Sequence, residues 1–86
     1  MAYSPEYRGA AEKYLDRLPQ NLRQRILDAV KRLPAGDVVK MQGREGYRLA
    51  VGGFRVLFDY TDTTTEDGAT IIDVVTIGFR GDIYKK

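Results

Sequence analysis

A chain of 86 residues with a net charge of +2 has room for one domain with one hydrophobic core, which we place over residues 1–86. Hydrophobic residues make up 43% of it, as in globular proteins, and neither a membrane span nor a secretory signal is visible. Cysteine and histidine are both absent, which excludes disulfides, thiolate zinc sites and the usual general base near neutral pH. We therefore expect a cytoplasmic protein with no metal and no cofactor.

The first predicted element is a helix that begins at Ser4. Ser4 is a suitable N-cap, Pro5 fits the first helical position, and Glu6 favours the positive end of the helix dipole. Pro19 ends the helix, because proline disfavours helical geometry at the residue before it. Residues 1–4 are then available for a short edge strand. The apolar side chains that share one face of this helix are Tyr7, Ala11, Tyr14, Leu15 and Leu18.

A second helix is predicted from about Gln20 to Leu33, again with amphipathic spacing. The joint at Pro19 is too short for anything but an antiparallel helical hairpin, so both apolar stripes must face a third layer. The sheet supplies that layer. The apolar face of this second helix consists of Leu22, Ile26, Ala29, Val30 and Leu33.

Beyond the turn at residues 34–37 the pattern changes to strands. Val38 to Met41 is extended, residues 42–46 form a loop, and two further strands, Tyr47 to Val51 and Phe54 to Tyr60, flank Gly52-Gly53. A two-residue Gly-Gly loop favours a primed hairpin turn and fixes the register of the two strands. One face of this hairpin then reads Tyr47, Leu49, Val51, Phe54, Val56, Phe58 and Tyr60, and the other reads Arg48, Ala50, Arg55, Leu57 and Asp59.

The last strand, Thr70 to Phe79, is rich in β-branched residues and is expected in the centre of the sheet. Residues 61–69 form an acidic hairpin loop before it. We expect the core to receive Val75, Ile77 and Phe79, and the arginine-bearing face to receive Thr76, Gly78 and Arg80. The predicted fold class is α+β, with the helical hairpin packed on a twisted, mainly antiparallel sheet of three to four strands.

Arginines gather on one face of this predicted sheet. Arg48 and Arg55 share the face by strand parity, Arg80 reaches it from the adjacent strand, and Tyr84 lies just beyond. Such guanidinium groups repel one another unless an anion lies between them, and their planar donors suit phosphate. A neighbouring aromatic ring can stack on an unpaired RNA base. The alternative is ordinary: arginine is common on the solvent face of a sheet, and Tyr84 can simply cap the core.

The other charged groups are weaker candidates. The helical cations are expected on solvated faces, and the carboxylates of residues 62–67 lie in a flexible loop where a metal site is improbable. The residues placed on solvated helix faces are Lys13, Arg17, Arg23, Lys31 and Arg32.

These residues resemble a known family. Two helices are followed by a hairpin, Tyr-Arg-Leu at 47–49 and Gly-Phe-Arg-Val-Leu-Phe at 53–58, and by Val-Thr-Ile-Gly-Phe-Arg-Gly-Asp-Ile-Tyr at 75–84. This order resembles the RelE/ParE superfamily of toxins from bacterial toxin–antitoxin systems, whose members often show a YRLRVGDYRVIY hairpin and end in IGHRREVY. The resemblance covers nearly the whole chain and is to the RelE-like branch.

The resemblance implies a metal-independent endoribonuclease that enters the ribosomal A site and cuts mRNA there. By position, Arg48 matches a basic residue of the first hairpin strand, and Arg55 matches the arginine at the scissile phosphate. Arg80 matches a general acid or charge stabiliser, and Tyr84 matches the tyrosine that orients or stacks on the substrate. The implied reaction is attack of a ribose 2′-hydroxyl on its phosphate, which gives a 2′,3′-cyclic phosphate.

Two departures from the family pattern leave the proton-transfer step open. Ala50 stands where RelE has a lysine proposed as base, and Phe79 stands where many relatives have histidine. Lys40, Arg44, Glu45 or a ribosomal group can assist, and we place Lys40 and Arg44 with Arg48 among the substrate-binding residues.

Three interpretations of function follow. The leading one is a ribosome-dependent endoribonuclease toxin, with the ribosome and mRNA as partners and a cognate antitoxin that covers the basic face or the helices. The second is a ParE-like poison of DNA gyrase, which needs no nuclease residues. The third is a non-catalytic partner-binding module, such as a decayed toxin. No membrane partner is expected.

Overall fold

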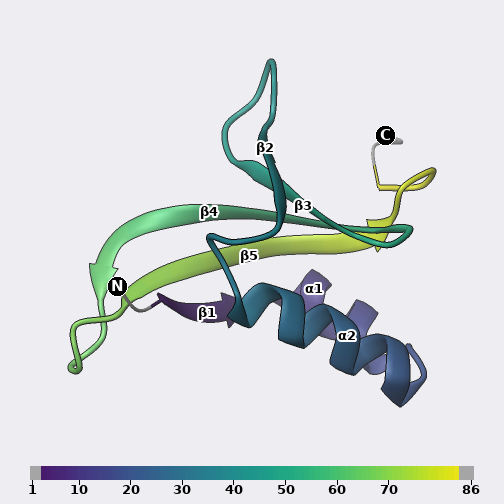
Figure 1. Cartoon of the computed structure of the whole chain (residues 1–86), viewed down its shortest axis with the longest axis horizontal. Helices are drawn as coiled ribbons and strands as arrows, with labels where there is room; N and C mark the ends of the chain where they lie inside the picture. Colours follow the sequence, from purple (N-terminus) through teal and green to yellow (C-terminus); the bar gives the residue numbers. More distant parts are fainter. Residues whose placement is uncertain (1–2, 84–86) are drawn as a thin grey trace.

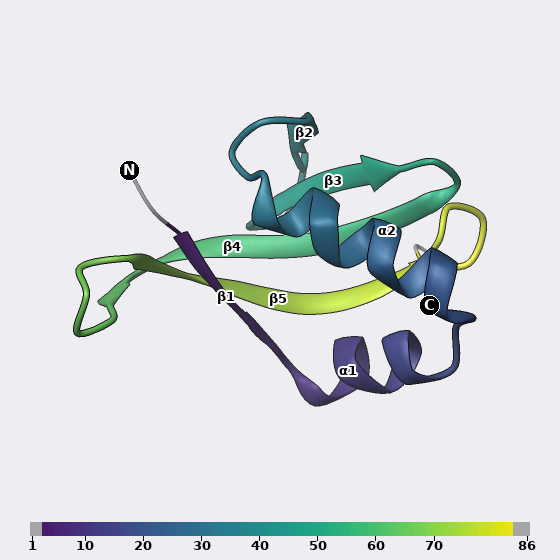
Figure 2. The same ribbon diagram turned by 60° about the horizontal axis from the view of Figure 1, so that its bottom comes forward.

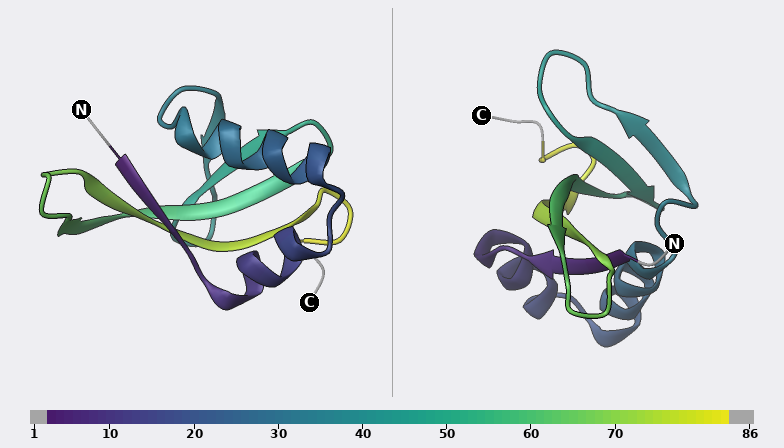
Figure 3. Two further views of the ribbon diagram at one scale, coloured as in Figure 1. Left: turned by 90° about the horizontal axis from the view of Figure 1, so that it is seen from below. Right: turned by 90° about the vertical axis from the view of Figure 1, so that its left-hand side faces the viewer.

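The computed structural model describes residues 3–83 as one five-stranded sheet with both helices on one of its faces (Figure 1, Figure 3). The strand order is β1-β5-β4-β3-β2, in which β1 runs parallel to β5 and every other pair is antiparallel. No helix in this part of the chain is long and apolar enough to cross a membrane. The elements are β1 (Tyr3–Tyr7), α1 (Gly9–Asp16), α2 (Gln20–Lys31), β2 (Asp37–Lys40), β3 (Tyr47–Val51), β4 (Phe54–Thr64) and β5 (Thr70–Phe79).

The N-terminal segment corrects the prediction of a helix from Ser4. Residues 3–7 form strand β1, which pairs with residues 70–74 of β5, and α1 begins only at Gly9. Pro5 is tolerated there because β1 is an edge strand, where a missing N–H costs no ladder hydrogen bond on the open side. Sheet pairing therefore prevails over the local capping signal, and the sheet has five strands instead of three to four.

The two helices follow one another through a short turn (Figure 2), but each packs chiefly on the sheet. Helix α1 lies against β5 and β1, whereas α2 lies against β1 and β3. The predicted antiparallel helical hairpin is therefore better described as two consecutive helices laid separately on one sheet face. Their apolar stripes still fill the core as predicted, through Ala11, Leu15, Ile26, Ala29, Val30 and Leu33.

Arg23 is a second correction, because it does not lie on a solvated helix face. Its side chain is partly buried, and its guanidinium group donates from Nε to the carbonyl oxygen of Leu15 and from Nη2 to that of Leu18, both at 2.9 Å. The Leu15 carbonyl, near the end of α1, otherwise accepts only backbone N–H groups of the following turn, and Leu18 lies in that turn. A side chain from α2 thus caps α1 and fixes the turn between the helices.

We expect Arg23→Ala to lower the free energy of unfolding by about 1–3 kcal/mol, because two carbonyl groups lose a charged donor. Urea denaturation measures this change. The matched control is Arg25→Ala, an exposed arginine of the same helix, for which we expect a change within about 0.5 kcal/mol. Equal effects of the two substitutions would contradict the capping role.

The predicted register of the β3–β4 hairpin is confirmed. Val51 lies opposite Phe54 and Ala50 opposite Arg55, with the chain reversing at Gly52, whose φ is +58°. Alternation then buries the side chains on the helix side of the sheet. The buried members of this face from β3 and β4 are Leu49, Val51, Phe54, Val56 and Phe58.

Strand β5 departs from the prediction at Val75. The register shifts between Leu57 and Phe58, so that Leu57 faces Thr76 and Phe58 faces Val74, and Val75 has no opposite residue. Such a bulge inserts one residue and reverses the alternation beyond it. Val74 is therefore fully buried while Val75 is 38% exposed. Ile77 is in the core as predicted.

Candidate nucleic-acid interface

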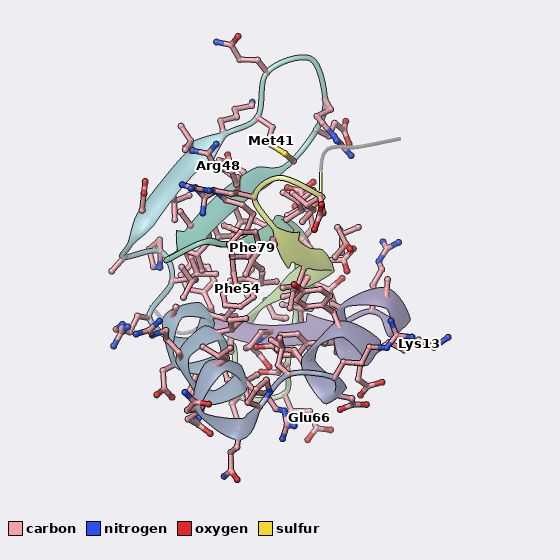
Figure 4. All side chains as sticks on the ribbon, turned by 90° about the vertical axis from the view of Figure 1, so that its right-hand side faces the viewer. Lys13, Met41, Arg48, Phe54, Glu66 and Phe79 are labelled. Carbon is pink, nitrogen blue, oxygen red and sulfur yellow. The ribbon has the colours of Figure 1, made fainter. Side chains whose placement is uncertain are left out.

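The sheet face away from the helices carries the arginines, and we call it the open face. The β2–β3 hairpin projects from this side of the sheet, and the turn at residues 80–83 lies on the same side (Figure 1, Figure 4). Its rows, read across the strands from β2 to β5, are Val39, Arg48, Leu57 and Thr76, then Asp37, Ala50, Arg55 and Gly78.

Arg48 and Arg55 lie on this face as diagonal neighbours. Arg48 is directly opposite Leu57, and Arg55 is two residues further along β4. Diagonal positions on one sheet face are about 7–8 Å apart, within reach of long side chains. The two guanidinium groups therefore emerge on the same side of the sheet, as strand parity predicted.

Arg48 has an unusual environment for a cation. Its side chain is only partly exposed, and its Nε is buried with no hydrogen-bond partner among residues 3–83. A buried donor without a partner is uncommon in proteins and costs free energy. The guanidinium group therefore has no hydrogen bond within residues 3–83 that an anion on the open face would have to displace.

Arg55 is held more firmly by its own hairpin. Its Nη1 donates to the carbonyl oxygens of Gly52 at 2.9 Å and Phe54 at 2.8 Å. Nε and Nη2 make no hydrogen bond to any residue that the structure describes. The turn thus fixes the side chain while these donors stay available to a ligand.

Arg80 follows the end of β5 and lies beside the same turn. Its backbone N–H donates to the carbonyl oxygen of Gly53 at 2.8 Å, which places Arg80 across from the β3–β4 hairpin. Its side chain is exposed, but strand alternation no longer fixes the side-chain direction because β5 ends at Phe79. Tyr84, predicted as the fourth site residue, lies outside the described residues.

The turn after Arg80 folds back over the sheet. The N–H groups of Asp82 and Ile83 donate to the carbonyl oxygen of Phe79 at 2.9 and 3.0 Å. Ile83 lies over Gly78, where an added Cβ would be 3.0 Å from the Ile83 Cβ. Gly78 therefore lets the C-terminal turn approach the open face.

Tyr14 in α1 lies close enough to this turn to be influenced by it. Burial, with a smaller contribution from Asp82, raises the pKa of Tyr14, so its hydroxyl stays protonated at neutral pH.

Lys40, Arg44 and Arg48 meet around one cavity, which we call the cationic cavity. It has a volume of about 400 Å³ and lies beside the β2–β3 hairpin, with Arg48 and Met41 labelled there in Figure 4. Among the described residues no carboxylate lines it. Arg55 and Arg80 do not line it either, so the predicted residues form two groups, one at this cavity and one at the Gly52-Gly53 turn. The other lining residues are Val39, Met41 and Gln42.

The apolar part of this lining was not among the predicted site residues. Val39 is 43% exposed on the open face, directly opposite Arg48, and Met41 lies where β2 ends. The alternation of β2 is the signal that could have placed Val39 there. These side chains give the cationic cavity an apolar wall.

Phe79 is 44% exposed and so is not the core residue that was predicted. Its ring meets the ring of Phe54 edge-on, with centroids 5.6 Å apart, and lies over Gly53. Any side chain at Gly53 would collide with this ring. The result is an exposed aromatic ring beside Arg80, at the end of the sheet.

Comparison with known proteins bears on the fold. No protein-family model matches the chain, and no curated protein matches it in sequence. Among solved structures, a chain of the toxin–antitoxin complex RelBE2 from Mycobacterium tuberculosis is similar, with a TM-score of 0.65 and 15% sequence identity over 93% of this chain and 100% of that chain. At this identity the likeness shows the fold. The protein therefore has the RelE-like fold that its hairpin and C-terminal motifs implied.

Proposed function

We propose that this protein is the toxin of a toxin–antitoxin system and acts as a metal-independent endoribonuclease on ribosome-bound mRNA. The observation that carries the proposal is the open face itself. Arg48 and Arg55 emerge there as diagonal neighbours, Lys40 and Arg44 adjoin Arg48, and no carboxylate of the described chain lines the cationic cavity. A sheet face of this kind suits the backbone of a single RNA strand.

The chemistry rests on charge stabilisation. When a ribose 2′-oxygen attacks the adjacent phosphorus, a P–O bond forms to that oxygen, the bond to the 5′-oxygen breaks, and negative charge grows on the phosphoryl oxygens. The available donors of Arg48 and Arg55 can stabilise that charge, and such preorganised donors typically supply the largest rate contribution. A general base adds only about 10²–10⁴-fold.

Two positions define how the proton step differs from the family pattern. Ala50 lies directly opposite Arg55 and supplies no general base. Phe79 offers an exposed ring that can stack on a nucleobase but cannot donate a proton. Lys40 and Arg44 are the nearest candidates on the chain for assistance at the cationic cavity. We therefore propose slow cleavage that depends on ribosomal groups.

An antitoxin is the proposed partner in the stored form. The solved structure with the similar fold is itself a toxin–antitoxin complex. Val39, Val75 and Phe79 are the large exposed apolar side chains of the described chain, and they lie on or beside the open face. A partner that covers them would also block the arginines.

The Ala50 and Phe79 departures favour a second candidate, a non-catalytic toxin-fold module that binds a partner. A ParE-like gyrase poison is the further alternative, since it needs no nuclease residues. Both predict that mRNA stays intact when the chain is expressed.

Expression of the chain without any antitoxin separates these functions. We expect growth arrest and new mRNA 5′ ends in phase with codons, detected by primer extension. An SOS response with intact mRNA would instead indicate a gyrase poison, and normal growth at comparable expression would indicate the non-catalytic module. A neighbouring short reading frame for an acidic chain that restores growth would support the antitoxin.

A further inference from the structure

Carboxylates cross the open face in one row next to the arginines. Asp59 on β4 lies directly opposite Asp73 on β5, and Asp73 is in turn opposite Glu6 on β1. Like charges directly opposite each other in a sheet are destabilising, so such a row is unusual unless it is neutralised. We call these three residues the acidic row.

Only part of this row is neutralised within the described chain. Arg8 holds Asp73 with bonds from Nε to Oδ1 at 2.9 Å and from Nη2 to Oδ2 at 2.6 Å. Asp59 has no cationic partner among residues 3–83, and its Oδ1 accepts only the N–H of Tyr60 at 2.9 Å. Asp59 therefore carries an uncompensated charge next to the arginines, as does Asp37 at the exposed β2 edge of the Arg55 row.

The geometry places Asp59 at the border of the cationic site. Leu57 on β4 is the residue opposite Arg48, and Arg55 and Asp59 lie two residues to either side of Leu57 on the same strand. Both are therefore diagonal neighbours of Arg48. A diagonal neighbour is about 7–8 Å away, which is less than the Debye length of about 8–10 Å at ordinary salt. Along β4, a phosphate held by Arg48 is thus favoured on the Arg55 side and disfavoured on the Asp59 side.

Two of the cavities show the same division, whereas a third, of about 350 Å³, is lined by Lys40 and Arg44 together with Glu45 and Asp59. The cationic cavity of about 400 Å³ is lined by the charges of Lys40, Arg44 and Arg48. A neighbouring cavity of about 250 Å³ shares Met41 and Arg44 with it, and its charged lining is Arg8, Arg44, Glu45, Asp59 and Asp73. Carboxylates outnumber cations there, so this second cavity is less favourable for phosphate than the cationic cavity.

We infer that Asp59 ends the RNA path on the open face: it confines phosphates to the side of Arg48 and Arg55 and limits the number of nucleotides that bind. The inference rests on the proposed function, since it concerns the same RNA site. A single strand then crosses the sheet from the β2–β3 hairpin toward the Gly52-Gly53 turn and stops before the acidic row. Asp59 contacts no reacting atom and acts as a specificity determinant.

The test measures binding of single-stranded oligouridylates of increasing length to the purified full chain by fluorescence anisotropy. For the wild type we expect affinity to rise with length and then level off. For Asp59→Asn we expect affinity to keep rising beyond that length, with a salt dependence, log K against log salt, steeper by about 0.7 for each additional phosphate bound. Asparagine keeps an oxygen that can accept the Tyr60 N–H.

The matched control is Glu66→Gln, which changes the net charge equally at the exposed β4–β5 hairpin, far from Arg48 in Figure 4. It should follow the wild-type length profile. Asp59→Ser repeats the test if the asparagine variant does not fold. Equal length profiles for wild type and Asp59→Asn, or a gain that is uniform at all lengths, would overturn the inference alone. Absence of RNA binding by every variant would overturn the proposed function and the inference with it.

Discussion

Replacing Arg48 by methionine is expected to abolish growth arrest by the expressed chain while the chain stays folded. Methionine retains the apolar stem that covers Leu57 and removes the cation. Loss of one preorganised donor to a developing oxyanion typically lowers the rate by about 10²–10³-fold. We therefore expect Arg48→Met to lower mRNA cleavage by this factor.

Although Arg48→Met is expected to lower activity, it is not expected to lower stability. The Nε of Arg48 is buried without a partner, and an unsatisfied buried donor costs about 1–3 kcal/mol. Removing the donor should leave the free energy of unfolding unchanged or raise it by about 1 kcal/mol. A residue that reduces stability while supporting activity is typical of a binding site.

Growth curves at matched expression, primer extension and urea denaturation test the two expectations together. Arg17→Met is the control, because Arg17 is exposed on the helix side and loses the same charge. It should arrest growth like the wild type. Undiminished toxicity of Arg48→Met would remove Arg48 from the site, and a large loss of stability would show that its role is structural.

The β3–β4 hairpin was predicted well because two signals agree there. The Gly52-Gly53 turn fixes which residues face each other, and strict alternation then decides the buried face. A one-residue slip would place Arg48 and Arg55 in the core, which the helices above forbid. Local sequence therefore suffices to place both arginines on the open face.

Strand β5 shows where such reasoning fails. Val74 and Val75 are both apolar, so a single sequence does not reveal which of them the bulge leaves outside. The bulge depends on the pairing of β5 with β4, a contact between distant segments. Simple alternation along β5 therefore predicted correctly that Ile77 is buried and wrongly that Val75 is buried.

The N-terminal error explains why the acidic row was missed. Ser4-Pro5-Glu6 has a helix-start pattern, and reading it as a helix removes β1 from the sheet. Without β1, nothing brings Arg8 to Asp73, which is 65 residues away in the chain. Sequence pattern does not fix the position of a loop residue. Arg44 was therefore named among the substrate-binding residues without a place in the sheet, and the structure puts it beside Arg48 at the cationic cavity.

Phe58→Ala is expected to lower the free energy of unfolding by about 3–5 kcal/mol, the largest stability effect predicted for this chain. The side chain is 1% exposed in the centre of the sheet. Its ring lies against those of Tyr47, with centroids 5.7 Å apart, and Tyr60, at 5.5 Å. The substitution leaves a cavity and removes both aromatic contacts. Domains typically have about 5–15 kcal/mol in total, so much of the stability is lost.

Urea denaturation measures this loss, and Phe79→Ala is the matched control. Phe79 is the same residue type on the neighbouring strand but 44% exposed, so its truncation should cost less than about half as much. Comparable losses for the two phenylalanines would show that the sheet core does not lie where the helices cover it.

Phe58 also connects the core to the site. Tyr47, which stacks on Phe58, is the first residue of β3 and the immediate neighbour of Arg48. Within the described sheet, the β2–β3 hairpin pairs only with β4, so the Phe58 contact helps hold Arg48 in place.

At temperatures where Phe58→Ala is still folded, we expect its binding of oligouridylate to be weaker than that of the wild type. Phe58→Leu should restore binding, because leucine refills the cavity. If leucine did not restore binding, the packing around Phe58 would not be what holds Arg48 in place.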